Sequence, residues 1–216
     1  MNARQKQILV GSILGDGGVY KGYTSSNAHY YVKQSEKHKE YVSWLFEELK
    51  GLCPSEIKQR KDNGQLYFYS SPSEDFSVLQ KKFYRNRKKI VPKDIKKLLT
   101  SPLSLAVWFM DDGTLDFRIK DHCAFHLCTN CFTKKDTNKL IAVLKQNFGI
   151  VATLHYTLCR GKRHARIYIG SKGRERFIKL ISPYILNCFK YKLPKYRTNP
   201  QRLDSIRNQM TNGATA

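Results

Sequence analysis

The chain has 216 residues, which is enough for one large domain or two small ones. Its 41% hydrophobic and 12% aromatic side chains can fill a core, so the composition excludes a wholly disordered chain. The 39 Lys and Arg against 17 Asp and Glu give a net charge of +22, of which residues 1–100 carry +9 and residues 101–216 carry +13. Because this excess is spread over both halves, we expect a polyanion, nucleic acid, to contact the whole molecule.

Neither a membrane segment nor a signal peptide is expected. No run approaches the ~18 apolar residues of a membrane-spanning helix. The N-terminal sequence MNARQKQILVGSILGDGG is interrupted by glycines before a signal-peptide core can form. The six cysteines lie mostly in apolar or β-patterned runs, unlike a disulfide scaffold. We therefore expect no membrane partner and a reducing intracellular location, either the cytoplasm or nucleoid of a prokaryote or an organelle matrix.

The first hundred residues alternate between helix and strand patterns. The spacing of apolar residues predicts a helix over residues 4–15, then strands in GVYKG and AHYYVKQS. A second helix is expected over residues 38–50, with Gly51 as its stop. The turn Asp62-Asn63-Gly64 predicts a hairpin between SEIKQRK and QLYFYSS, and a third helix follows over about 74–84.

The same order of elements returns after Pro102. LSLAVWFMDDG reads as a helix, GTLDF and CAFHLCT as strands, and KKDTNKLIAVLKQNFG as an amphipathic helix. VATLHYTL and HARIYIG then form a hairpin around Gly161, and GRERFIKLISPYI is the last helix. We predict a duplicated α+β fold with one repeat over 1–100, a basic linker over about 85–101, a second repeat over 101–210 and a disordered tail over 211–216.

Each repeat opens with an apolar helix that ends in Asp-Gly: LVGSILGDG at 9–17 and LAVWFMDDG at 105–113. An acid at a helix C-terminus faces the negative end of the helix dipole. If the two helices pack together, Asp16 and Asp112 also repel each other, and a divalent cation relieves both problems. Mg²⁺ suits a site of a few carboxylate oxygens with water and phosphate. Asp111 is the second candidate, because the alignment places it opposite Gly15.

These two segments resemble the signature of the LAGLIDADG homing endonucleases, specifically the single-chain kind with two motifs. The resemblance extends over residues 5–197 and includes SPLSLAVWFMDDG, FTKKD from Phe132, and SPYI and YKLP between Ser182 and Pro194. It implies two pseudo-symmetric αββαββα halves whose antiparallel sheets form a saddle across DNA. It also implies an intron-encoded enzyme that cuts both DNA strands with divalent metal.

The resemblance further implies which residues form the metal site. Asp16 and Asp112 are the expected ligands, with Gly15 and Asp111 beside them. Mg²⁺ is the expected cofactor, Mn²⁺ is expected to replace it, and Ca²⁺ is expected to support binding without cleavage. In the helix pair, motif 1 supplies small residues at Gly11 and Gly15, whereas motif 2 has Val107 and Asp111. We therefore expect an asymmetric and less tight helix pair.

A basic residue beside each scissile phosphate is also implied by the resemblance, and Lys89 and Lys192 match its position. Each lies shortly before a proline, in KKIVP and in YKLP. The alternative is that both are general phosphate contacts, like the neighbouring lysines Lys88, Lys93, Lys190 and Lys195. Polar side chains at the end of the second strand of each repeat, Gln34 and Asn130, are implied to hold water or metal.

The second hairpin predicts a sheet with one buried and one polar face. In VATLHYTL the residues Ala152, Leu154, Tyr156 and Leu158 are apolar and alternate with polar ones. A basic sheet face of this kind can lie in the DNA major groove. The predicted DNA-binding residues are Lys33, Gln34, Lys58, Arg60, Lys61, Tyr67, Tyr69, Asn130, Thr153, His155, Arg160, Lys162, Arg163, His164, Arg166 and Tyr168.

Three alternatives stay open at this stage. The cluster His122, Cys123, His126, Cys128 and Cys131 allows a zinc site, although a single CxxC without a second pair is a weak signal. An RNA-binding intron maturase would also use a basic, aromatic sheet. A non-catalytic DNA-binding protein would share the fold but have no use for two carboxylates. The main expectation is a monomer on a long, asymmetric double-stranded DNA site.

Overall fold

The computed structural model describes residues 1–53, 56–118, 122–159 and 161–194. Arg160 and the predicted tail 211–216 lie outside these residues. The first αββαββα unit consists of α1 (Ala3–Leu14), β1 (Gly18–Lys21), β2 (Ala28–Gln34), α2 (Lys39–Leu49), β3 (Lys58–Gln59), β4 (Leu66–Tyr69) and α3 (Glu74–Phe83).

The second unit repeats this order and confirms the duplicated fold. It consists of α5 (Pro102–Asp112), β7 (Gly113–Arg118), β8 (His122–Cys128), α6 (Lys134–Phe148), β9 (Thr153–Cys159), β10 (Lys162–Ile169) and α7 (Ser171–Ile181). The segment predicted as a linker contains regular structure, namely β5 (Tyr84–Arg85), β6 (Lys88–Lys89) and α4 (Ile95–Leu98). Short 3-10 helices span Glu36–His38, Lys50–Leu52, Ser182–Tyr184 and Asn187–Lys192.

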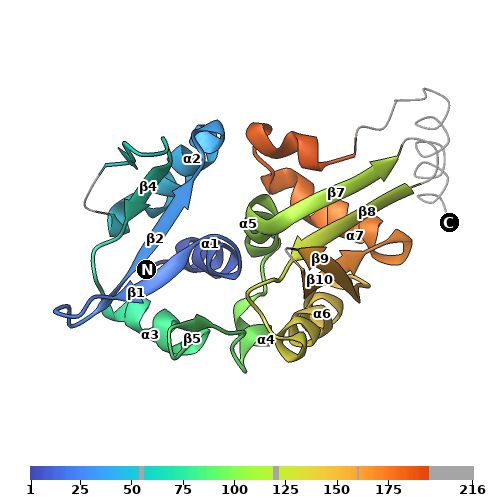
Figure 1. Ribbon diagram of the computed structural model, residues 1–216, viewed down its shortest axis with the longest axis horizontal. Helices are drawn as coiled ribbons and strands as arrows, with labels where there is room; N and C mark the ends of the chain where they lie inside the picture. Colours follow the sequence, from blue (N-terminus) through green and yellow to red (C-terminus); the bar gives the residue numbers. More distant parts are fainter. Residues whose placement is uncertain (54–55, 119–121, 160, 195–216) are drawn as a thin grey trace, which may run out of the picture.

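Each unit contains a four-stranded antiparallel sheet with the same topology. The strand orders are β1-β2-β4-β3 and β7-β8-β10-β9. The registers match as well, because Gly18 pairs with Tyr31 while Thr114, 96 positions later, pairs with His126. In Figure 1 helices α1 and α5 run side by side at the centre, and the two sheets lie on either side of this pair.

Helices cover one face of each sheet. Helices α2 and α3 pack on the first sheet, and α6 and α7 pack on the second. Along β2, buried residues alternate with half-buried or exposed ones, so the other face of this sheet is accessible. Buried hydrophobic residues of both units form one continuous core around α1 and α5. Within the described residues, no helix has the length and apolar character needed to cross a membrane.

Local sequence signals fix where several helices begin and end. Asn2 and Gln5 form a capping box at the start of α1, each side chain accepting a hydrogen bond from the other's backbone N–H. The Thr133 side chain caps α6, and α6 ends at Gly149, whose φ of +67° lies in the left-handed region that favours glycine. Capping residues therefore mark the start of α1 and both ends of α6.

Close contact between α1 and α5 depends on glycines of α1. A Cβ atom added to Gly11 would lie 2.3 Å from the carbonyl oxygen of Ser104 and 2.9 Å from Cβ of Val107. The Ser104 hydroxyl donates to the backbone carbonyl of Gln7, at 2.7 Å, across the same interface. The glycines come from α1 alone, but our expectation of a less tight pair is wrong, because the backbones approach to the limit that glycine allows.

We expect the variant Gly11→Ala to lose about 1–3 kcal/mol of unfolding free energy, because its methyl group would overlap the α5 backbone. Urea denaturation measures this change. Gly51→Ala is the matched control, since a Cβ at Gly51 meets no atom within 4 Å among the described residues. Its unfolding free energy should change by no more than about 0.5 kcal/mol. Equal stability of both variants would contradict the close helix contact.

Candidate active site

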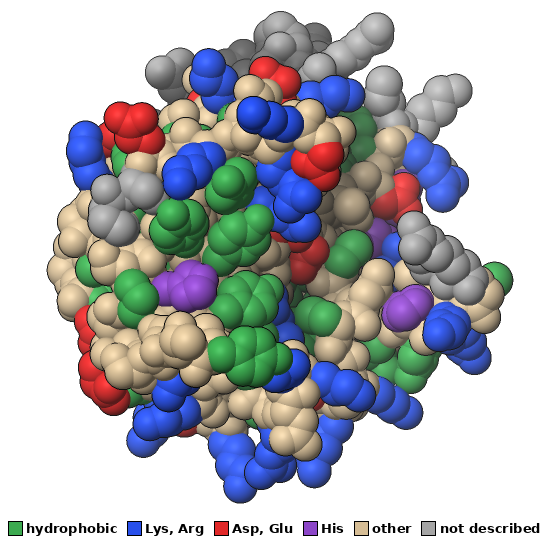
Figure 2. Space-filling view, turned by 60° about the vertical axis from the view of Figure 1, so that its left-hand side comes forward, with side chains coloured by type: hydrophobic (Ala, Val, Ile, Leu, Met, Phe, Trp, Pro, Cys, Tyr) green, Lys and Arg blue, Asp and Glu red, His purple; other side chains and the backbone are tan. Residues whose placement is uncertain are grey.

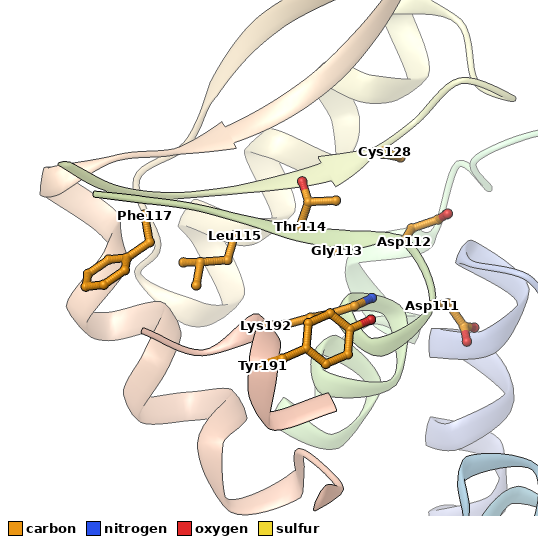
Figure 3. Close-up of a pocket in the computed structure, with 9 residues that line it drawn as sticks. All are labelled: Asp111, Asp112, Gly113, Thr114, Leu115, Phe117, Cys128, Tyr191 and Lys192. Carbon is orange, nitrogen blue, oxygen red and sulfur yellow. The ribbon is translucent and has the colours of Figure 1, made fainter. Parts of the chain in front are cut away.

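The ends of the paired helices carry three carboxylates. Asp16 directly follows the Gly15 cap of α1 and is exposed, whereas Asp111 and Asp112 end α5 and are half-buried. The backbone N–H of Asp16 donates to Oδ2 of Asp111 at 3.2 Å. A Cβ at Gly15 would lie 2.4 Å from Cβ of Asp111, so only glycine leaves room for this side chain. Figure 3 shows Asp111 pointing toward α1.

Gln34 bridges the acids of the two helices. It is the last residue of β2 and is buried, and its Nε2 donates to Oδ2 of Asp16 at 2.8 Å and to Oδ1 of Asp111 at 3.3 Å. Nδ1 of His38 lies 3.4 Å from Oε1 of Gln34. Gln34 is thus turned toward the acids and away from the accessible sheet face, where the other predicted β2 residue, Lys33, lies.

The second unit has no matching amide beside the acids among the described contacts. Because Tyr31 corresponds to His126 in the strand registers, Gln34 corresponds to Thr129. The Thr129 hydroxyl is buried and donates to the carbonyl of Ala165 at 2.7 Å. Asn130 follows one residue later and is exposed. The sequence alone misplaces this position by one residue, since the end of β8 is set by its pairing with β10.

Lys89 and Lys192 each donate to the C-terminal carbonyls of one motif helix. Nζ of Lys89 lies 2.8 Å from the Gly15 oxygen and 3.0 Å from the Gly17 oxygen. Nζ of Lys192 lies 2.6 Å from the Met110 oxygen, and its side chain is buried. Each ammonium therefore offsets the negative end of a helix dipole. The structure thus places both lysines beside the acids, one for each repeat.

The acids and lysines shift one another's proton affinity. Burial raises the pKa of Asp111 well above its usual range, and the charge of Asp16 adds to the effect. Burial, again reinforced by Asp16, raises the pKa of Asp112 to about 7, although Lys89 and Lys192 oppose this shift. Burial lowers the pKa of both lysines, against the pull of the aspartates. The carboxylates are thus held close together with incomplete compensation of their charge.

A cavity of about 600 Å³ opens beside the two α5 aspartates. Figure 3 shows that its walls come from α5, β7, the end of β8 and the 3-10 helix that carries Tyr191 and Lys192. It therefore places a buried ammonium and two carboxylates around one space. The lining residues are Asp111, Asp112, Gly113, Thr114, Leu115, Phe117, Cys128, Tyr191 and Lys192.

The donor set fits a hard divalent cation that has further ligands from outside the protein. Among the described residues, no three His, Cys, Asp or Glu side chains are grouped to hold a metal ion by themselves. Mg²⁺ accepts one or two carboxylates together with water and phosphate oxygens. The carbonyl of Gly15, the remaining predicted ligand, accepts from Lys89. Burial and the charge of Asp16 both raise the aspartate pKa values, and a cation between the helix ends would offset both effects.

The cysteines of the possible zinc cluster lie in different surroundings. Cys123 belongs to the core, Cys128 lines the acid cavity, and Cys131 is a free, exposed cysteine. Nε2 of His122 lies 3.2 Å from Oδ2 of Asp116. His126 lies on the accessible face of β8, opposite Tyr168 of β10. The strand pairing therefore distributes these side chains over the core, the cavity and the surface.

Most predicted DNA-binding residues of the strands share the accessible sheet faces. On the first sheet, Lys33 and Lys58 both lie opposite Tyr67, and Tyr69 lies two positions away on the same face. The following turn carries Arg60, which pairs with Asp62 at 2.9 Å, and the exposed Lys61. On the second sheet, the shared face carries Thr153, His155, Lys162, His164, Arg166 and Tyr168.

One predicted DNA-binding residue of the second hairpin lies off the accessible face, and the burial expected for two apolar residues is wrong. Arg163 lies on the opposite face, with its guanidinium 4.6 Å from the ring centre of Tyr156. Tyr156 and Leu158, expected in the core, are 41% and 72% exposed. The alternating apolar residues do share one face of the sheet. The outer end of the hairpin, however, extends beyond the helices α6 and α7 that cover this face. Alternation alone does not show how far helices reach along a sheet.

The structure also brings residues that were not predicted from the sequence to the site or to the accessible faces. His29 and Tyr31 share the face of Lys33, as the alternation of AHYYVKQS already implies. Tyr41 of α2 is buried, and its pKa is raised by burial and by the charge of Asp111. Tyr191, 58% exposed, lines the cavity. No sequence signal marks the last two, because their places depend on contacts between distant elements.

A sequence model of the LAGLIDADG DNA endonuclease family matches residues 6–177. The chain belongs to this family. The cytochrome b mRNA maturase bI2 of Debaryomyces hansenii is 31% identical, covering 88% of this chain and 73% of the relative. The DNA endonuclease I-ChuI of Chlamydomonas applanata is 28% identical, covering 89% of this chain and 95% of the relative.

The solved structure of the homing endonuclease I-WcaI bound to its DNA recognition sequence has a TM-score of 0.77 to this chain. Its sequence is 27% identical, and the match covers 89% of this chain and 87% of that one. The family and the fold implied by the two Asp-Gly motifs are therefore confirmed. Membership also places the chain among DNA-cleaving hydrolases.

The raised pKa of Asp112 predicts a pH-dependent effect of metal on stability. Its folded pKa of about 7 lies above the ~3.9 of an unfolded aspartate, so the folded state binds the extra proton. This carboxyl therefore makes the metal-free protein less stable as the pH rises from about 4 to 7. Ca²⁺ or Mg²⁺ should raise the melting temperature more at pH 8 than at pH 5.5.

Asp112→Asn is the control for this effect, and thermal unfolding with and without metal measures it. The variant should show a smaller loss of stability between pH 5.5 and pH 8 than the wild type. A pH dependence identical to that of the wild type would show that Asp112 does not titrate in this range.

Proposed function

We propose that the protein is a site-specific double-strand DNA endonuclease whose catalytic residues are Asp16, Asp112, Lys89 and Lys192. The observation that carries this proposal is the meeting of carboxylates and lysines at the ends of two paired helices, between two sheets with basic accessible faces. One chain already supplies two sheet modules with different side chains. It therefore acts as a monomer on a long, asymmetric duplex.

Asp16 and Asp112 are the proposed metal ligands, with Asp111 and the Gly15 carbonyl beside them. Mg²⁺ is the proposed ion, and Mn²⁺ should replace it. When bound, the ion would supply activation of water and stabilisation of the charge that grows on the phosphate oxygens. Gln34 orients the acids by donating to Asp16 and Asp111. Both α5 acids line the cavity, but Asp112 is the better placed to reach a phosphate, because Asp111 already accepts hydrogen bonds from the Asp16 backbone and from Gln34.

Lys89 and Lys192 provide one ammonium at each helix end. Both donate to backbone carbonyls beside the aspartates, which fixes their position relative to the acids. An ammonium at this place stabilises negative charge on a scissile phosphate, and one lysine for each repeat matches one cut in each strand. Lys88 and Lys190 are exposed neighbours, suited to contacts with the DNA backbone.

RNA binding is the second candidate function. One relative, 31% identical to this chain, is named an mRNA maturase. The accessible face of the first sheet carries several tyrosines, and aromatic residues are common in RNA-binding sheets. A randomised DNA library incubated with the protein and Mg²⁺ decides between the functions. Recovery of a cleaved target supports the endonuclease, and its absence, together with intron RNA binding, favours the maturase.

The variants Asp16→Asn and Asp112→Asn should abolish double-strand cleavage in Mg²⁺ while leaving binding in Ca²⁺ near normal. Loss of a carboxylate removes a metal ligand but keeps the basic sheets that hold DNA. Cleavage gels and a binding titration measure the two properties. Asp75→Asn, an exposed acid at the start of α3, is the control and should cut normally. A wild-type cleavage rate in either site variant would show that the site is misassigned.

Lys89→Met and Lys192→Met should slow single-turnover cleavage at saturating protein by far more than they weaken binding. Lys88→Met and Lys190→Met should show the reverse, each lowering the salt dependence of binding by about one phosphate contact. Since Lys192 is buried against α5, a thermal melt must confirm that its variant is folded. Equal rate losses for Lys88 and Lys89 would reduce both to general phosphate contacts.

A further inference from the structure

The accessible face of the first sheet is dominated by tyrosine. Tyr20 and His29 lie opposite each other on β1 and β2, and Tyr31 lies opposite Tyr69 on β4. Tyr67 completes the group between Lys33 and Lys58. Figure 2, where tyrosines are coloured with the hydrophobic side chains, shows such side chains gathered around a histidine on this half of the molecule.

These rings pack edge to face and do not form a flat platform. The centroids of Tyr20 and Tyr31 are 6.4 Å apart with an interplanar angle of 69°, and those of His29 and Tyr69 are 6.3 Å apart at 73°. The Tyr31 and Tyr67 rings are tilted by 45°. Unpaired bases stack on exposed ring faces. Tilted, half-buried rings instead present edges and hydroxyl groups, which suits contact with the floor of a DNA groove.

Two cations of the first sheet and its hairpin turn, Lys58 and Arg60, already have partners. Nζ of Lys58 lies 3.3 Å from the hydroxyl of Tyr69, and the guanidinium of Arg60 donates twice to Asp62, at 2.9 Å each. The strands of this sheet contain no arginine. The sheet therefore lacks the free guanidinium fork that pairs with O6 and N7 of guanine in the major groove.

The second sheet has the opposite chemistry. Its accessible face carries one tyrosine and several polar groups, and Nε of Arg166 is buried without a hydrogen-bond partner among the described residues. Arg166 lies between Cys128 and His155 in the strand registers. The ring of His155, which lies opposite Arg166, stacks on the ring of Tyr168 at 4.2 Å with an interplanar angle of 2°. This stack limits the space on the β9 side of Arg166. An unpaired guanidinium nitrogen is costly, and an acceptor on a ligand would satisfy it.

His126 adds a second unused nitrogen beside Arg166. Its Nδ1 is buried and has no hydrogen-bond partner in the described part of the chain. Burial, followed by the charge of Arg166, lowers the pKa of His126 to about 4, so the imidazole is neutral at pH 7. The second sheet thus carries unpaired polar nitrogens, whereas the first sheet carries ring edges.

We propose that the two sheets read different chemical features of the same DNA target. The first sheet contacts the C5 methyl groups of thymines through Tyr31, Tyr67 and Tyr69, and the second contacts guanine through Arg166. Thymine is the one base with a methyl group in the major groove, and guanine is the base with two acceptors that match a guanidinium. This inference rests on the proposed endonuclease function and specifies its target: a thymine-rich half-site joined to a half-site with an essential guanine.

The first test is the base composition of targets selected from a randomised library. One half-site should be enriched in thymines whose methyl groups face the protein in the DNA major groove. The other half-site should contain an invariant guanine. Two half-sites of equal composition would overturn the inference while leaving the endonuclease intact. Failure to select any DNA would overturn the endonuclease and the inference together.

The second test removes single groups from the selected DNA and measures Kd in Ca²⁺. Deoxyuridine in place of thymidine removes only the methyl groups, and we expect about a fourfold loss of affinity for each methyl in contact. 7-Deazaguanine removes only the N7 acceptor and should weaken binding about fivefold or more. The deoxyuridine penalty should be confined to one half-site and the 7-deazaguanine penalty to the other.

Variants assign each penalty to a sheet. Tyr67→Ser should remove most of the deoxyuridine penalty, and Arg166→Gln should remove the 7-deazaguanine penalty. Tyr156→Ser and Arg163→Gln are the matched controls, because both side chains lie on the opposite sheet face, and they should keep both penalties. Thermal melts establish that all four variants are folded. Penalties that persist in Tyr67→Ser and Arg166→Gln would overturn the inference.

Single-stranded RNA tests the competing ligand for the tyrosine face. If the tyrosines serve as stacking partners, Tyr67→Ser will weaken binding of an unstructured RNA and leave the affinity for the DNA target unchanged. That result would overturn the assignment to thymine methyl groups. Loss of DNA affinity in Tyr67→Ser, with RNA binding unaffected, is the outcome that we expect.

Discussion

The contact between α1 and α5 is the constraint on which the rest of the structure depends. Gly11 and Gly15 allow the two helix backbones to approach until Ser104 and Asp111 occupy the space of the missing Cβ atoms. This approach sets the distance between the two Asp-Gly ends. It also joins the cores of the two repeats, so the two sheets are held at a fixed relation around the acids.

The same contact concentrates negative charge where the helix dipoles already disfavour it. The protein compensates this charge with Gln34, which donates to acids of both helices, and with one lysine at each helix end. Burial, reinforced by the charge of Asp16, nevertheless raises the pKa values of Asp111 and Asp112. A site that tolerates such repulsion is prepared for a cation and for the phosphates that accompany it.

The two repeats share a backbone but differ in chemistry. Identical strand orders and registers place Tyr31 and His126 at matching positions, yet one belongs to a tyrosine-rich face and the other to a face of imidazoles and a guanidinium. The amide of Gln34 also has no counterpart at Thr129, whose hydroxyl is turned into its own sheet. Duplication thus preserved the framework, while the side chains on the accessible faces diverged.

The sequence by itself determined the two units, because the alternation of strands and the spacing of helices depend on neighbouring residues. It also singled out Asp16 and Asp112 as candidate metal ligands, since each precedes a glycine at the end of an apolar helix pattern. Tertiary structure alone decided that Gln34 points at the acids, that Asp111 fits against Gly15, and that Tyr41 lies nearby, because these contacts join residues far apart in the chain. It also decided that Tyr156 and Leu158 stay exposed: an alternating pattern fixes which face a residue shares, whereas burial depends on the length of the helix packed against it.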